Sequence, residues 1–368
     1  GRPDLFMHII AGIGEVDSAE PSHALWEMGR LVRSSSGLTE AFDNGVEGLL
    51  DRLAESGEAD ALSFLEAFEA FVYSYGSRGP NEWEVRSPTW ETRPELALSA
   101  IERMRLAPEE AAPKKQHAQR SAQREEAAAQ LLAMVEADPE VHGELSAGIA
   151  ASMAWLPGRE RTKTNNIRLI HEIRVRMRMI GERMVAIGAF DEIEDFGFLE
   201  EAEYSDLFAD PLSMLETIRT RREEYYGLLE REAQFLFHGE ADPPETWRRR
   251  DDEADDKLEA GNTLQGMPGC PGLAEGRARV ILDSNDPTEL EPGDILIAPI
   301  TDPSWTPLFV PAAAVVVDVG APLSHAIIVS RELGIPCVVS ATDATRKIPN
   351  GALVQVNGDT GVVTVLEE

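Results

Sequence analysis

Apolar residues recur at three- and four-residue spacing through most of the first 238 residues, and this pattern predicts amphipathic helices. The periodic stretches are Ser22–Ser34, Leu38–Ala54, Ala59–Tyr75, Pro94–Leu106, Glu109–Ala137, Asn165–Ile187 and Pro211–Phe237. A segment rich in Pro, Gly and Trp, residues 76–94, interrupts the series. The apolar pattern over residues 1–238 therefore predicts one large all-helical domain.

The pattern changes after residue 238. Residues 239–260 are charged, Pro-interrupted and poor in aliphatic side chains, which is more typical of a linker than of a solvated helix end. The period then switches to two in short β-branched runs, which predict strands. These runs are Gly276–Leu282, Asp294–Ala298, Ala313–Val319, Pro336–Val339, Leu353–Val356 and Val362–Leu366. The sequence thus predicts a helical domain over 1–238, a charged linker over 239–265, and a small α/β domain over 266–368.

Composition narrows the possible partners and location. The chain of 368 residues has 34 basic and 66 acidic side chains, a net charge of -32. Such a surface repels nucleic acid and anionic membranes, so we expect neither as a partner. No apolar run reaches transmembrane length. Cys270 and Cys337 form neither a disulfide framework nor a metal-ligand spacing, which favours the cytoplasm and predicts no metal site. Because the chain begins inside a helical pattern without an initiator Met, we expect a fragment of a longer protein.

Residues 320–336 carry the most informative chemistry. His325 follows a Gly/Pro turn and begins a short apolar helix, with Ser324 as the expected N-cap and Gly334 as the C-terminal stop. A helix N-terminus offers unpaired N–H groups and partial positive charge, which suit a phosphoryl group. An imidazole is both a nucleophile and a leaving group near pH 7. The spacing alone leaves open a core histidine in a β–α unit.

This segment closely resembles the phosphohistidine motif of the phosphoenolpyruvate-utilising enzymes. That group includes phosphoenolpyruvate synthase, pyruvate phosphate dikinase and the rifampicin phosphotransferases. The matching residues are Gly320, Leu323–Ala326 and Ser330–Val339. Ala321 stands where the motif has a second Gly, and Leu323, in place of a frequent Thr, is closer to the rifampicin phosphotransferase branch.

The resemblance extends over residues 266–365 and has consequences for fold and site. It implies a swivelling β/β/α phosphohistidine domain. The predicted fold is therefore multi-domain, with a large all-helical domain followed by a small β/β/α domain. It also implies that His325 is the catalytic, phosphorylated residue, supported by Ser324 and Gly320. We therefore expect the His325 ring to be exposed, with helix N–H groups able to meet a phosphate.

A second, less specific resemblance lies in the helical region. Residues 75–94 and 159–163 are similar to segments of rifampicin phosphotransferase-like proteins, whose helical region binds the acceptor. The residues implied as ligands of phosphate or acceptor are Arg78, Glu82, Arg159, Arg161 and Lys163. The alternative is that these arginines form structural pairs with Glu82, Glu91 or Glu160.

The resemblance also implies a phosphoryl donor outside the chain. The relatives phosphorylate the histidine in an ATP-grasp domain, and the dikinases add a phosphoenolpyruvate-binding barrel; the motifs of neither are present here. ATP or phosphoenolpyruvate, with Mg, is thus expected at a missing domain or subunit, and no cofactor on this chain. We expect part of a phosphotransferase, a kinase-like enzyme in which His325 swivels about residues 239–265 to a small-molecule acceptor on the helical domain. The alternatives are a phosphocarrier or regulatory subunit without acceptor chemistry, and a scaffold.

Overall fold

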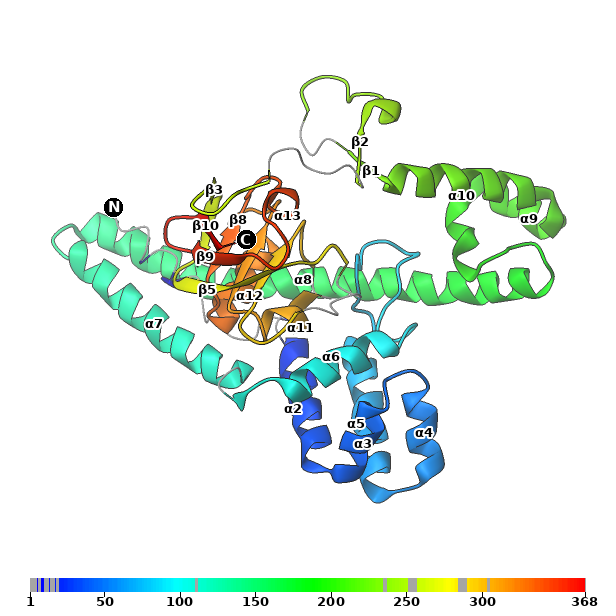
Figure 1. The fold of residues 1–368 in the computed structure, drawn as a ribbon, viewed down its shortest axis with the longest axis horizontal. Coiled ribbons are helices and arrows are strands. Elements are labelled where there is room, and N and C mark those ends of the chain that lie inside the picture. The colour runs from blue at the N-terminus through cyan, green and yellow to red at the C-terminus, as the bar shows by residue number, and fades with distance from the viewer. Residues whose placement is uncertain are drawn as a thin grey trace. The chain divides into compact units, whose positions relative to one another are not determined.

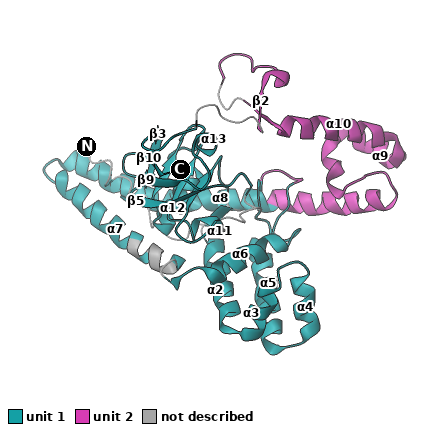
Figure 2. Ribbon diagram, in the orientation of Figure 1, with its two compact units in different colours: residues 1–82, 87–168, 256–368 teal, residues 83–86, 169–255 magenta. Residues whose placement is uncertain are grey.

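The computed structural model describes residues 5, 8–9, 13, 17, 20–109, 112–233, 237–250, 257–283, 290–302 and 305–367. The chain divides into two compact units (Figure 2). The first comprises residues 1–82, 87–168 and 256–368, and the second comprises residues 83–86 and 169–255. Helices occupy most of residues 20–229 and a mixed sheet follows them, so the predicted fold class is confirmed.

The helical part of the first unit is a set of amphipathic helices (Figure 1). They are α2 (Glu20–Ser34), α3 (Ser36–Asp43), α4 (Leu49–Ser56), α5 (Ala59–Tyr75), α6 (Glu95–Leu106), α7 (Pro113–Met134) and the start of α8 (Pro139–Ala186). The prediction of a single helix over Leu38–Ala54 is wrong. The chain breaks between α3 and α4, where Gly45 and Gly48 have φ angles of 88° and 62° in the left-handed region.

The second unit contains the rest of α8 and the segments after it. These are the 3-10 turns η2 (Ile193–Phe198), η3 (Glu201–Glu203), η4 (Pro211–Met214) and η5 (Pro244–Thr246), the helices α9 (Tyr204–Ala209) and α10 (Leu215–Leu229), and the strands β1 (Arg231–Glu232) and β2 (Arg248–Arg249). Its core gathers Phe190, Phe196, Phe198, Leu207 and Ile218. The helix predicted to reach Phe237 ends at Leu229, because the chain turns there into β1, which pairs with β2.

The α/β part of the first unit is built on an eight-stranded sheet. Its strands are β3 (Thr263–Gln265), β4 (Met267–Cys270), β5 (Leu273–Val280), β6 (Ile295–Ala298), β7 (Ala314–Val317), β8 (Cys337–Val339), β9 (Leu353–Asn357) and β10 (Val362–Glu367), in the order β3-β10-β9-β5-β6-β7-β8-β4. The predicted linker therefore differs at its end, since β3 already pairs with β10.

Strand β5 joins two differently built halves of this sheet. Residues 273–277 pair antiparallel with β9, and residues 278–280 pair parallel with β6. Side chains of β6 then alternate between two cores, as a strand buried on both faces requires. Ile295 and Ile297 pack toward β9 and β10, whereas Leu296 and Ala298 pack toward the helices α11 (Thr306–Phe309) and α12 (His325–Leu333). A further helix of this part, α13, spans Ala344–Lys347.

The apolar cluster under α11 and α12 continues into the helical part. Leu98, Ile101 and Met104 of α6 belong to the same buried cluster as Leu308 and Phe309 of α11. Helix α12 also contacts α7. The two compact units consequently do not follow the predicted domain boundaries at residues 238 and 266. Within the first unit, α11 of the α/β part packs against α6, and α12 packs against α7.

Candidate active site

His325 is placed at the start of α12 by a tight β-to-α turn. Gly320 lies against β8, where an added Cβ would come within 2.7 Å of Val339 Cβ, so only Gly fits without a shift. The Ser324 backbone is extended and its N–H donates to Ala321 O at 2.8 Å. The prediction that the Ser324 side chain caps α12 is wrong, because Ser324 Oγ makes no hydrogen bond to the first turn of the helix. Among the described residues this buried hydroxyl has no hydrogen-bond partner. Gly334 ends the helix at a φ of 73°, as predicted.

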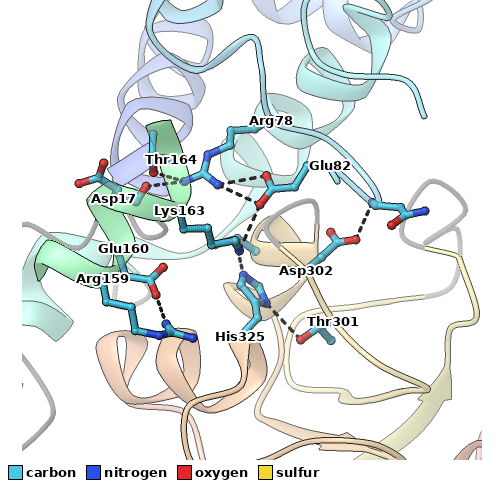
Figure 3. Close-up of polar contacts among 12 residues, drawn as sticks. Asp17, Arg78, Glu82, Arg159, Glu160, Lys163, Thr164, Thr301, Asp302 and His325 are labelled. Carbon is cyan, nitrogen blue, oxygen red and sulfur yellow. Dashed lines mark hydrogen bonds and ion pairs between the residues drawn. The ribbon is translucent and has the colours of Figure 1, made fainter. Parts of the chain in front are cut away.

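The His325 ring is half-buried, so the expectation of an exposed ring is wrong. Nδ1 lies 3.1 Å from Thr301 Oγ1 (Figure 3), and Nε2 lies 3.3 Å from Thr306 Oγ1. The ring also meets Phe309 edge to face, with centroids 5.9 Å apart. Burial was missed because it arises from α11 and from the helical part, which no local pattern around His325 encodes.

Burial lowers the pKa of His325 well below 6.5, and the positive charges of Lys163 and Arg78 lower it further. Each of these causes disfavours the imidazolium. The ring is therefore neutral at pH 7, with one nitrogen lone pair available. A neutral imidazole is the nucleophilic form.

The charges near the ring come from a buried cluster in the helical part. Arg78 donates to both carboxylate oxygens of Glu82 at 3.0 Å, to Thr164 Oγ1 at 2.9 Å and to Asp17 O at 3.3 Å. Lys163 Nζ lies 3.1 Å from Glu82 Oε1, and its side chain extends toward His325 (Figure 3). Arg78 and Glu82 are each only 1% exposed. Two cations thus share one carboxylate, which leaves net positive charge beside the ring.

The other two predicted arginines are placed differently. Arg159 is paired with Glu160, and its Nη2 lies 3.4 Å from the Leu323 carbonyl, two residues before His325. Arg161 donates from Nε to both carboxylate oxygens of Asp17 at 2.8 Å, and its side chain is 58% exposed. The structural alternative holds in part, because Arg78 and Arg159 do pair with Glu82 and Glu160.

Sequence reasoning missed the residues contributed by the end of β6. Thr301 and Asp302 follow that strand closely, and His325 follows the neighbouring parallel strand β7. The carboxyl ends of adjacent parallel strands meet at one edge of a sheet. That rule, applied to the predicted strands, could have brought Thr301 to His325 from the sequence alone. Thr306, further along the chain, is fixed only by the packing of α11.

A small pocket is lined by residues of α8 and α12 and by Leu323 in the turn before His325. Its lining residues are Ile13, Leu156, Arg159, Glu160, Leu323, Ile328, Arg331 and Glu332. Arg331 donates to Gly269 O and Pro322 O, each at 3.2 Å, so it fixes the turn that leads into α12. The pocket wall therefore combines apolar side chains with charged ones that already have partners.

The described residues bear on two features, a metal centre and a membrane-spanning helix. In this part of the chain, no three His, Cys, Asp or Glu side chains are grouped so that they could hold a metal ion. Across the same residues, no helix has the length and apolar character needed to span a membrane. Cys270 and Cys337 are buried thiols, 1% and 0% exposed, and burial raises the pKa of Cys270 to about 11. His171 is buried too, with Nδ1 3.1 Å from Arg174 Nη1.

Comparison with known proteins links both halves of the site to one group. Residues 1–160 match the model of the rifampicin phosphotransferase fourth domain, and residues 290–361 match the mobile domain of PEP-utilising enzymes. The rifampicin phosphotransferase of Streptomyces sviceus is 30% identical over 95% of this chain and 40% of its own length. That of Bacillus cereus is 27% identical over 82% of this chain and 34% of its own length.

An uncharacterized protein of Mycobacterium tuberculosis strain H37Rv is 32% identical over 86% of this chain and 34% of its own length. A solved structure, Thermococcus kodakaraensis aconitase X, matches 29% of this chain at 21% identity with a TM-score of 0.24, too low to bear on the fold. The chain spans 34% to 40% of the length of the three curated relatives named here.

The predicted resemblance is confirmed: the chain is similar to the phosphoenolpyruvate-utilising enzymes, whose mobile-domain model it matches over residues 290–361. Over most of its length it is similar to the rifampicin phosphotransferases.

Proposed function

We propose that this chain is the transfer part of a phosphotransferase, in which His325 carries a phosphoryl group to a small-molecule acceptor bound by the helical part. The donor, ATP or phosphoenolpyruvate with Mg, would act at a site outside this chain. The observation that carries the proposal is a neutral, half-buried imidazole at a helix N-terminus beside Lys163 and the Arg78–Glu82 pair.

The proposed first step is an in-line displacement at phosphorus. Thr301 Oγ1 lies 3.1 Å from Nδ1, and the proposed step uses the tautomer in which Nδ1–H donates to this hydroxyl and Nε2 keeps the lone pair. The Thr306 hydroxyl turns away from Nε2 to admit the phosphoryl group. Nε2 attacks, the N–P bond forms, and the bond from phosphorus to the donor's leaving oxygen breaks. The ring then carries the positive charge of an N-phosphorylated imidazolium.

The second step reverses this chemistry on the acceptor. An acceptor hydroxyl loses its proton to solvent or to a base, its oxygen attacks phosphorus, and the N–P bond breaks. A phosphate ester and neutral His325 remain. Lys163, helped by Arg78, would hold the phosphoryl oxygens during the transfer, because cations aimed at equatorial oxygens stabilise charge in the transition state.

The proposal is tested first without any nucleotide domain. Potassium phosphoramidate transfers its phosphoryl group to imidazole with release of ammonia, and mass spectrometry locates the modified side chain. We expect an acid-labile phosphoryl group on His325 that is absent from His325→Asn and kept in His142→Asn, a matched change on α8. Labelling of other histidines with none on His325 would overturn the proposal.

The acceptor step separates the proposed function from its rival. The phosphorylated chain is mixed with candidate acceptors, and loss of phosphohistidine is followed with time. They include rifampicin, which carries hydroxyl groups, and pyruvate, whose enol form would supply the attacking oxygen. Acceleration by one of them, with a phosphorylated product, supports transfer on the helical part. Stable phosphohistidine with every compound, and exchange only with a partner protein, would favour a phosphocarrier.

A further inference from the structure

The loop that carries Arg78 and Glu82 touches the α/β part at a second point. The backbone N–H of Asn81 donates to Asp302 Oδ2 at 2.7 Å (Figure 3). Asn81 has a φ of 48°, in the left-handed region that few non-Gly residues adopt. This conformation turns its N–H outward from the helical part and onto Asp302.

The loop that carries Asn81 is fixed by further contacts within the helical part. Trp90 N donates to Arg78 O at 2.8 Å, and an added Cβ at Gly79 would lie 2.4 Å from Pro88 O. The guanidinium of Arg78 is buried and bonded to Glu82 and Thr164. The Asn81 N–H is therefore presented by a fixed loop and does not depend on a mobile chain.

Asp302 also adjoins a residue that contacts the reacting ring. It follows Thr301, whose Oγ1 lies 3.1 Å from His325 Nδ1. One hydrogen bond between Asn81 and Asp302 thus ties the strand end that holds the imidazole to the loop that holds the cations. Charge-assisted hydrogen bonds of this length are the strong ones.

From this juxtaposition we infer that Asp302 is a positioning residue that locks the α/β part onto the helical part with His325 beside Lys163. The inference rests on the proposed function for its purpose, since one imidazole must reach separate donor and acceptor sites. The contact can be tested with no phosphoryl donor at all. Losing it raises the fraction of molecules in which the His325 ring is exposed.

The experiment measures the rate at which diethyl pyrocarbonate modifies His325 in this chain at pH 7, with modified peptides counted by mass spectrometry. We expect Asp302→Ala to raise this rate about fivefold or more, because a hydrogen bond to a charged group is lost. Asp302→Asn keeps an acceptor oxygen and stays within about twofold of the wild type. Glu275→Ala, an exposed carboxylate bonded to Gln355 within the sheet, is the matched control and is expected to change nothing.

A second pair of variants addresses the same contact from the helical side. Asn81→Pro removes the N–H and cannot adopt a positive φ, so it is expected to raise the His325 rate as Asp302→Ala does. Asn81→Gly keeps the N–H and accepts the same φ, so its rate should match the wild type. The double variant Asp302→Ala/Asn81→Pro should raise the His325 rate no further than either single variant, because both changes break the same Asn81–Asp302 hydrogen bond.

Two results would overturn the inference. One is an unchanged His325 rate in both Asp302→Ala and Asn81→Pro. The other is an equal rise at His142, the internal reference on α8, which would mean general loosening of the fold. Neither result depends on phosphoryl transfer. If phosphoramidate fails to label His325 while the docking variants behave as expected, the proposed function fails and the docking contact stands.

Discussion

Replacing Arg78 with Met should destabilise the first unit strongly. The change removes the guanidinium that gives Glu82 two hydrogen bonds at 3.0 Å and that also bonds Thr164 and Asp17. Glu82 would stay 1% exposed with a negative charge. Removing one partner of a buried ion pair costs about 3–5 kcal/mol. Because Lys163 remains 3.1 Å from Glu82, we expect the lower end, about 3 kcal/mol.

Hydrogen exchange of the α5 and α6 amides, read by mass spectrometry, reports the opening free energy of this unit separately from the second unit. The matched control is Arg161→Met, whose side chain is 58% exposed and pairs with Asp17, and its cost should stay below about 1 kcal/mol. The double variant Arg78→Met/Glu82→Gln should recover about 1–2 kcal/mol, since it removes a buried carboxylate that has lost one of its two cations. A cost for Arg78→Met no larger than that for Arg161→Met would refute the reasoning.

Three further outcomes follow from the same geometry. The pKa of His325 is lowered in the folded state, so the unfolded chain binds more protons below pH 6.5 and stability falls on acidification. The wild type should lose about 1.4 kcal/mol more than His325→Gln between pH 7.5 and 5.5 in urea unfolding, and parallel losses would argue against a neutral buried ring. Lys163→Met should raise the pKa of His325 in an NMR titration yet leave it below 6.5, because burial is the larger cause of the lowered pKa. An unchanged pKa would mean that the charge of Lys163 does not act on the ring. Calorimetry of this chain with Mg-ATP should detect no micromolar binding, since a net charge of -32 disfavours a polyanion, and such binding would place a donor site here.

The parts of the fold set by local periodicity could be predicted from the sequence. Helices α2, α5 and α6 lie close to their predicted ranges, and strands β6 to β10 fall within or close to their β-branched runs. The errors fall where local pattern competes with backbone conformation or tertiary contact. Gly45 and Gly48 break a helix whose apolar spacing runs on unbroken. The three-residue strand β3 is too short for alternation to register, and only its pairing with β10 defines it.

The candidate site divides in the same way. His325, Gly320 and the Arg78 and Lys163 cations could be named because a motif marks each segment. Thr301, Thr306 and Asp302 carry no motif and become neighbours only when β6, β7 and α11 assemble. The half-burial of the ring belongs to this second group, since Phe309 and the helical part supply it.

The low pKa of His325 and the proposed transfer have a common physical origin. Positive charge from Lys163 and Arg78 opposes a proton on the ring, because that proton adds a third cation to a poorly solvated site. The same charge favours a phosphoryl group on the ring, which brings negative oxygens to the same place. A site built this way keeps the histidine neutral and nucleophilic when empty, and stabilises it when phosphorylated. A histidine buried only among apolar side chains would have the first property and lack the second.

Lys163→Met should therefore shorten the lifetime of phosphohistidine in the docked chain while leaving the neutral ring intact. A lifetime unchanged from the wild type would mean that the cations serve the fold alone.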